Sequence, residues 1–267
     1  MMEYNKGKYT FWMLINQYQI KIPIMQRDYA QGRQSENVSA IRADLLESIY
    51  NALINEKNID FDFVYGTLEN GVVYPLDGQQ RLTTLYLLYW YIACKESCCE
   101  KAKKALHNFT YETRISSREF CEQLVELDYK PNEKVFPSSY IKNQNMYFDV
   151  WDKDPTIRHM LVMLDAIHEK FWDTDKELFP LLIRDIESDP VITFNYLPME
   201  NYALTDDLYI KMNARGKNLS DFENFKAKFI EHMKKNGFPF EHFEASIDTN
   251  WTDLLWDYRS KKKQYHR

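Results

Sequence analysis

The amino-acid sequence predicts an α+β protein that is mostly helical, with a small mixed sheet near the N-terminus packed by helices and followed by a helical region. Glycine (7) and proline (9) are scarce among the 267 residues and 45% are hydrophobic, which favours long ordered elements around a sizeable core. Apolar residues recur at helical spacing over 36–55. Two strand-like runs flank Asn70-Gly71, the strongest short signal for a β-hairpin.

The N-terminal half alternates helices with extended segments. Ile22 precedes Pro23 and is therefore pushed towards an extended conformation. The Asp77-Gly78 turn precedes a strongly apolar helix, with Asp77 expected as its N-cap and Gln80 as the capping-box partner. In chain order we expect a helix over 9–19, an extended segment at 22–24, a loop over 26–34, a helix over 36–55, strands over 61–68 and 72–76, and a helix over 79–95.

The second half carries further helix-start signals. Ser116 with Glu119 fits a capping box, and Asp154-Pro155 is typical of the start of a helix. In chain order we expect a helix over 101–107, an extended segment at 111–114, a helix over 116–127, a loop over 129–139, two or three helices between 140 and 186, a strand over 191–197, and helices over 205–213, over 225–235 after a capping box at Ser220, and around 251–256.

Composition excludes several classes of protein. The net charge of −6 gives no general attraction to nucleic acid, and Lys261-Lys262-Lys263 is best explained as a solvated helix end. Four cysteines without a CxxC pair make a weak case for zinc and are expected as reduced thiols. We find no signal-peptide pattern and no apolar run long enough to span a bilayer, so we expect a cytoplasmic protein.

The segment Asp77-Gly78-Gln79-Gln80-Arg81 combines groups that suit a phosphate. The first turn of a helix presents free N–H groups and a positive dipole end, to which this segment adds two amides and a guanidinium. Asp77 could also hold Mg²⁺, which favours a few carboxylates together with phosphate oxygens. A capped helix with solvated polar side chains explains the same residues, and no Walker A motif is present.

Two other segments place basic residues where a strand or a helix ends. In 22–29, Gln26, Arg27 and Tyr29 follow a predicted strand. In 209–220, a helix ends near Gly216, and Arg215 and Lys217 lie on the connection to the next helix. On local grounds a surface loop explains the first segment better than a binding site does, and an ordinary helix–loop–helix explains the second at least as well.

The three segments together resemble a known family. Ile22-Pro23-Ile24-Met25-Gln26-Arg27-Asp28-Tyr29, then Asp77-Gly78-Gln79-Gln80-Arg81-Leu82-Thr83-Thr84, then Asn213-Ala214-Arg215-Gly216-Lys217-Asn218-Leu219-Ser220 resemble the N-terminal domains of GmrSD-type modification-dependent restriction endonucleases. The resemblance spans roughly residues 9 to 235, and DGQQRLTT is its most specific part. This family is similar to the ParB/sulfiredoxin-like fold, in which a DGxxR-type loop binds nucleotide phosphates.

The resemblance implies an NTP-binding and NTP-hydrolysing domain, with GTP or ATP and Mg²⁺ as ligands, in a phage-defence system that restricts modified DNA. Catalytic roles carry over to Asp77, Gln79, Gln80 and Arg81, with Asp77 also as the metal ligand. Nucleotide-binding roles carry over to Gln26, Arg27, Tyr29, Gly78, Thr83, Thr84, Asn213, Arg215 and Lys217. Modified DNA and a nuclease domain or subunit are the implied partners. We expect residues 1–110 to form the nucleotide-binding part and residues 111–267 a mainly helical part packed on it, as a fragment of a longer protein.

Two other functions stay open at this point. A metal-dependent nuclease is one, although the chain has no His-Asn-His-type motif and no clustered carboxylate–lysine motif. A non-enzymatic module that senses modified DNA or a partner protein is the other, with Tyr4, Tyr9 and Tyr29 as possible stacking surfaces. For Trp12 we expect core packing instead.

Overall fold

One six-stranded mixed sheet forms the centre of the fold, in the order β1-β6-β3-β4-β2-β5. The computed structural model describes residues 7–23, 29–34, 36–112 and 115–198. Strands β1 and β6, and β3 and β4, pair antiparallel, while β2 pairs parallel with β4 and β5, and β3 pairs parallel with β6. The strands are β1 (Gly7–Tyr9), β2 (Gln19–Ile22), β3 (Ile59–Glu69), β4 (Val72–Asp77), β5 (Phe109–Tyr111) and β6 (Ile192–Pro198).

The predicted hairpin is confirmed as β3 and β4. Asn70 and Gly71 connect the strands, both in the left-handed region with φ of 51° and 80°. Two successive residues with positive φ match the right-handed twist of the flanking strands, and asparagine and glycine adopt that conformation most readily. The turn brings β4 back beside β3, so that β4 ends at the start of the following helix.

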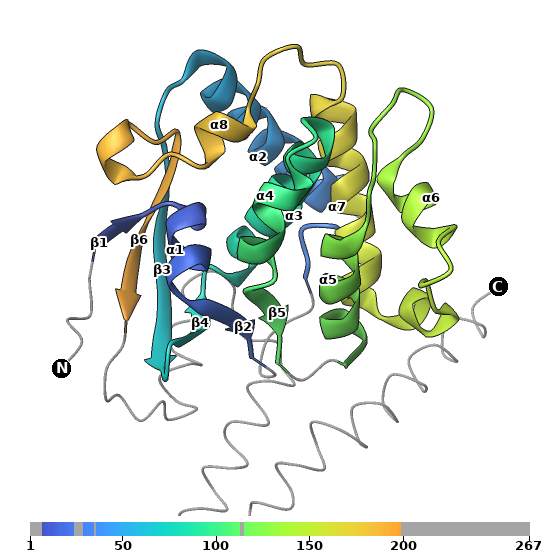
Figure 1. Ribbon diagram of the computed structural model, residues 1–267, viewed down its shortest axis with the longest axis horizontal. Coiled ribbons are helices and arrows are strands. Elements are labelled where there is room, and N and C mark those ends of the chain that lie inside the picture. The colour runs from blue at the N-terminus through green and yellow to red at the C-terminus, as the bar shows by residue number, and fades with distance from the viewer. Residues whose placement is uncertain (1–6, 24–28, 35, 113–114, 199–267) are drawn as a thin grey trace, which may run out of the picture. The chain divides into compact units, whose positions relative to one another are not determined.

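Helices pack against this sheet (Figure 1). The predicted limits of 36–55 and 79–95 are confirmed without change as α2 and α3. The helices are α1 (Phe11–Gln17), α2 (Glu36–Asn55), α3 (Gln79–Lys95), α4 (Cys99–Leu106), α5 (Ile115–Glu126), α6 (Pro137–Lys142), α7 (Pro155–Phe171) and α8 (Phe179–Leu182), with short 3-10 helices η1 (Asp149–Lys153) and η2 (Ile186–Ser188).

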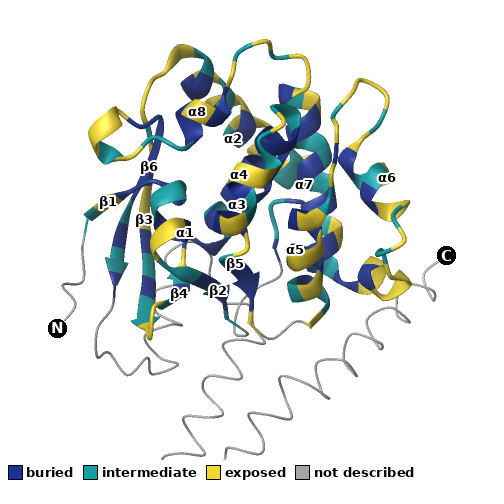
Figure 2. Ribbon diagram, in the orientation of Figure 1, coloured by how far each residue is buried: buried dark blue, intermediate teal, exposed yellow. Residues whose placement is uncertain are grey.

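Helix α3 is the core of the described part. Every residue from Leu82 to Cys94 is buried, as befits a helix that is apolar on all sides. Aromatic rings from other elements surround it: Tyr86 stacks on Phe109 of β5 with ring centroids 4.6 Å apart, and Trp12 stacks on Tyr89. Trp12 is half-buried and packs against the core, as expected. By contrast, α5 has one buried and one exposed face (Figure 2).

Of the two helix-start predictions in this region, the one at Asp154 is confirmed and the one at Ser116 is wrong. Asp154 caps α7 as predicted, since its carboxylate accepts a 2.8 Å hydrogen bond from the N–H of Thr156. Ser116 does not cap α5, because α5 already begins at Ile115. The hydroxyl groups of Ser116 and Ser117 instead donate to the Asp154 carboxylate, so one side chain joins the starts of α5 and α7.

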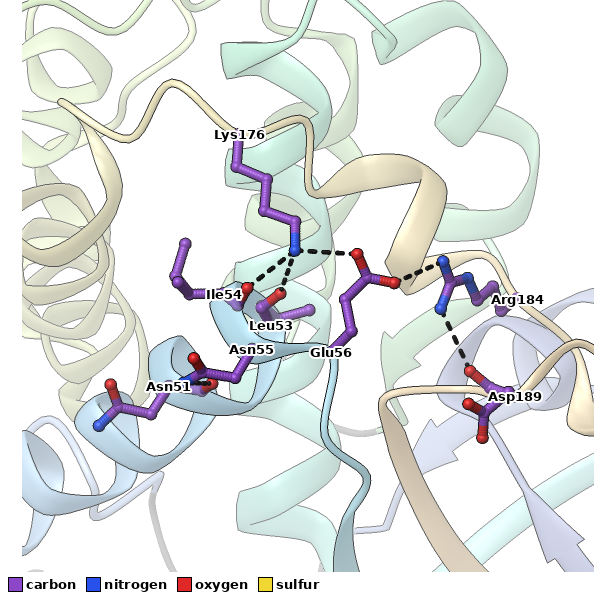
Figure 3. A network of polar contacts seen from close by, with 8 residues as sticks. All are labelled: Asn51, Leu53, Ile54, Asn55, Glu56, Lys176, Arg184 and Asp189. Atoms are coloured by element: carbon purple, nitrogen blue, oxygen red, sulfur yellow. Dashed lines mark hydrogen bonds and ion pairs between the residues drawn. The ribbon is translucent and has the colours of Figure 1, made fainter.

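A polar network closes the C-terminal end of α2 (Figure 3). Lys176 Nζ donates to the carbonyls of Leu53 and Ile54, at 3.2 and 2.9 Å, which α2 leaves without helical partners. Glu56 bridges Lys176 and Arg184 through its two carboxylate oxygens, at 3.0 and 2.9 Å. The network connects α2 to the segment that precedes β6.

The sheet draws strands from beyond the predicted division at residue 110. Strand β5 spans that position, and β6 comes from residues 192–198 yet pairs with both β1 and β3. By spatial proximity the chain divides into two units, Met1–Ala203 and Leu204–Arg267. Within the described part, no helix combines the length and the apolarity that a membrane span requires.

Candidate nucleotide site at the start of α3

The β4–α3 connection is built around Gly78. This residue adopts φ 85° and ψ 0°, and a Cβ atom there would lie 2.8 Å from Val64 Cγ2. Glycine is therefore required both for the left-handed backbone and for the close approach to β3. Gly78 itself is the N-cap, so the prediction that Asp77 caps α3 is wrong: Asp77 is the last residue of β4. The helix begins without a side-chain cap, and its positive end lies beside an exposed carboxylate.

The two glutamines of the motif hold the backbone in place. The side chain of Gln79 is buried and donates from Nε2 to the carbonyl of Pro75 in β4. Gln80 is not a capping-box partner of Asp77: its Oε1 accepts a 2.7 Å hydrogen bond from the main-chain N–H of Ala30. Gln79 thus fixes the strand–helix connection, and Gln80 ties it to the 29–34 loop, a name used below for residues 29 to 34.

The guanidinium of Arg81 is directed at β3. It donates from Nη1 to the carbonyl of Phe61 and from Nη2 to the carbonyl of Phe63, the second at 2.8 Å. These carbonyls flank Asp62, where positive φ (57°) accompanies a shift in the β3–β6 register. Arg81 Nη2 also lies 3.6 Å from Asp77 Oδ2. One arginine therefore connects the bulged strand, the end of β4 and the first turn of α3.

Thr83, Thr84 and Tyr29 are all buried. Thr84 Oγ1 lies 2.7 Å from the hydroxyl of Tyr29 and also hydrogen bonds Gln31 Oε1, while Thr83 Oγ1 lies 3.0 Å from the hydroxyl of Tyr111. Burial raises the pKa of Tyr29 well above its ordinary value. These contacts give the three residues a positioning role in the described structure.

The other predicted site residues lie outside the described part of the chain. These are Gln26, Arg27, Asn213, Arg215 and Lys217. The predicted helices over 205–213 and 225–235 and the capping box at Ser220 also fall there.

Three residues that the sequence did not single out organise the site. Ala30 and Gln31 bind the motif helix, and His159 Nδ1 donates a 2.6 Å hydrogen bond to the main-chain carbonyl of Tyr29. Residues that form hydrogen bonds across 50 to 130 positions of the chain leave no recognisable pattern in a single sequence. A sequence pattern could suggest the segments but not their pairing.

A magnesium ion bound together with a nucleotide fits the residues at this junction. Asp77 offers an exposed carboxylate at the mouth of α3, and Mg²⁺ usually needs only one or two carboxylates when phosphate oxygens supply further ligands. In the described ranges, no three His, Cys, Asp or Glu side chains gather into a metal site by themselves. Cys94 and Cys99 are free thiols with their sulfur atoms 3.2 Å apart.

Comparison with known protein families gives a match over most of the chain. The family model described as the GmrSD restriction endonuclease N-terminal domain matches residues 11–230. No curated protein and no solved structure matches the chain. The match includes all three segments that carry the resemblance, from Ile22 to Ser220. The chain therefore belongs to the GmrSD restriction endonuclease N-terminal domain family and is a component of a restriction, or phage-defence, system.

Proposed function

We propose that this domain binds a nucleoside triphosphate at the β4–α3 junction and hydrolyses it, and that hydrolysis controls restriction of modified DNA. The observation that carries the proposal is the start of α3, which has no side-chain cap and follows the exposed carboxylate of Asp77. The first N–H groups of an α-helix have no partner within the helix, and the dipole of a 17-residue helix such as α3 favours an anion at that end. Membership of the restriction family supplies the biological setting.

The phosphates would accept hydrogen bonds from the first-turn amides of α3. Phosphoryl transfer is catalysed mainly by positioning and by stabilisation of charge, which backbone amides, arginine and a metal ion provide. Asp77 would hold Mg²⁺, which would offset part of the negative charge of the phosphates. Gln80 is a better candidate than Gln79 for orienting a water molecule, because Gln79 is only 5% exposed.

Arg81 would act in two ways. A guanidinium has five N–H donors, and the Phe61 and Phe63 carbonyls accept from two of them. The side chain is 26% exposed, so its remaining donors and its charge would act on phosphates at the same junction. Arg27 and Arg215 would add further positive charge, and Asn213 and Lys217 would complete the nucleotide contacts.

Hydrolysis would then be read by a nuclease module. Phosphoryl transfer can release a segment that the terminal phosphate holds in place. The 29–34 loop is suited to such a response, because Gln80 and Thr84 of α3 both bind it. Modified DNA and a nuclease domain or subunit are the proposed partners.

The test is phosphate release from ATP, GTP, CTP and UTP, with and without modified DNA. Asp77→Asn should abolish Mg²⁺-dependent release while leaving the melting temperature almost unchanged, because Asp77 does not cap α3. Glu69→Gln, at the exposed end of β3, is the matched carboxylate control. Unchanged hydrolysis by Asp77→Asn would refute the site. Metal-dependent DNA nicking without any nucleotide would favour the nuclease alternative.

A further inference from the structure

A pocket of about 400 Å³ lies between the 29–34 loop and helices α6 and α7. It is separate from the residues at the start of α3, and its apolar floor includes Leu161 and Val162. The rest of its lining consists of Gly32 and the polar residues Gln34, Ser138, Lys142, Arg158, His159 and Asp165. Pockets of this size hold small organic ligands in many proteins.

The acidic residue of the pocket already has its hydrogen-bond donors. Asp165 accepts from the main-chain N–H of Ser138 at 2.9 Å and from its hydroxyl at 2.6 Å. Both carboxylate oxygens are thus engaged, and burial raises the pKa of Asp165. Asp165 therefore holds the start of α6 against α7 through these two hydrogen bonds.

The basic residues are placed to receive an anion. The side chain of Arg158 is exposed and forms no hydrogen bond or salt bridge with the described residues, and its positive charge helps to lower the pKa of the nearby Asp152. Lys142 makes a 2.8 Å ion pair with Asp152 at the surface, a type of contact that contributes little and exchanges readily. Lys142 and Arg158 are the cationic side chains of the lining, with Asp165 in the same lining and Asp152 close to both of them.

We propose that this pocket binds a small phosphate-bearing molecule, with Arg158 and Lys142 contacting the phosphate. Arginine pairs with phosphate through two parallel N–H bonds, and lysine adds a compact point charge. The apolar floor would receive the rest of the molecule. A small ligand is favoured over duplex DNA because the pocket offers two cationic side chains beside Asp165 and not an extended basic surface.

The pocket is connected to the start of α3 through the 29–34 loop. A Cβ atom on Gly32 would lie 1.9 Å from the carbonyl oxygen of His159, so the loop rests directly on the backbone of α7. His159 binds the Tyr29 carbonyl, and Ala30 binds Gln80. Occupancy of the pocket would therefore change the position of the loop and the rate of nucleotide hydrolysis. This coupling rests on the proposed function, whereas the binding does not.

Calorimetric titration of the full chain with inorganic pyrophosphate tests the binding. The double variant Arg158→Gln/Lys142→Gln should lose at least tenfold in affinity for a site that Asp77→Asn leaves intact. Lys130→Gln is the control, because Lys130 is a 79% exposed lysine in an ion pair with Asp128. Hydrogen exchange should show pyrophosphate protecting residues 138–142 and 155–165 in the wild type but not in the double variant.

Each other result has a defined meaning. Equal affinity in the double variant and the wild type, or no binding at all, would overturn the pocket assignment. The pocket assignment would also be overturned if the double variant lost affinity for short duplex DNA but kept its affinity for pyrophosphate. If Asp77→Asn kept full nucleotide hydrolysis while the double variant lost its affinity for pyrophosphate, the proposed function would be refuted and the assignment of the pocket as a phosphate site would be supported.

Discussion

The main-chain amide of Ala30 donates a 2.7 Å hydrogen bond to Oε1 of Gln80, which lies 50 positions later in the chain. This contact joins the 29–34 loop to the first turn of α3. It gives Gln80 an acceptor role that a carboxylate also satisfies and an aliphatic side chain does not.

Gln80→Leu should therefore destabilise the domain, and Gln80→Glu should not. The leucine variant leaves the Ala30 N–H without this acceptor, at a cost of about 1–2 kcal/mol. The glutamate variant keeps an acceptor, and its negative charge is favourable near the start of α3. Urea unfolding measures both. Equal midpoints for Gln80→Leu and the wild type would show that the contact is dispensable.

Arg81 should matter for stability as well as for nucleotide binding. Arg81→Ala removes the donors to the Phe61 and Phe63 carbonyls, and charged donors of this kind contribute about 1.5–3 kcal/mol. Arg81→Lys should be intermediate, because lysine keeps the charge but loses the planar fork. Lys57→Ala, which removes an exposed cation between α2 and β3, serves as the control. A fully stable Arg81→Ala variant that no longer binds nucleotide would assign the guanidinium to the ligand alone.

Gly32 should not tolerate even one added methyl group. A Cβ atom at this position meets the carbonyl oxygen, carbonyl carbon and Cα of His159, all backbone atoms that cannot rotate away. Overpacking of this kind costs about 1–3 kcal/mol, so Gly32→Ala should lower the unfolding midpoint and weaken protection of the 29–34 loop in hydrogen exchange. Arg33→Ala on the same loop changes an exposed side chain and should leave both readouts unchanged. An unaffected Gly32→Ala variant would mean that the loop does not rest on α7.

The elements that local patterns specify could be predicted from the sequence. Helices α2 and α3 have the predicted limits because apolar periodicity and flanking turns mark both ends. The Asn70-Gly71 hairpin is local in the same sense. The N-cap of α3 could not be predicted from the DGQQR motif alone. Asp77 remains paired with β3 as the last residue of β4, and Gly78, packed closely against Val64, is the N-cap.

The candidate site was predicted as a set of segments and not as a geometry. The direction of Arg81 depends on a bulge in β3 that brings two carbonyls into reach. The direction of Gln80 depends on where the 29–34 loop lies, which His159 of α7 helps to fix. Both depend on tertiary contacts that one sequence does not encode as a pattern.

The Glu56 network provides a pH-dependent test of how α2 is held. The hydrogen bond from Lys176, followed by that from Arg184, lowers the pKa of Glu56 from its ordinary value of 4.5 (Figure 3). A carboxyl whose folded-state pKa is lowered stabilises the protein above its unfolded-state pKa, and this contribution is lost as the pH falls through the folded-state pKa. Glu56→Gln should therefore be less stable than the wild type at pH 7.

The difference between the two proteins should shrink as the pH is lowered below about 4.5 and nearly vanish once Glu56 is protonated in both states. Urea midpoints at a series of pH values measure it, with Glu133→Gln as an exposed carboxylate control that should show no gap at any pH. Because the network is at the surface, added salt at pH 7 should also narrow the gap. A gap that stays constant from pH 7 to pH 3 would mean that Glu56 acts through its shape and not through its charge.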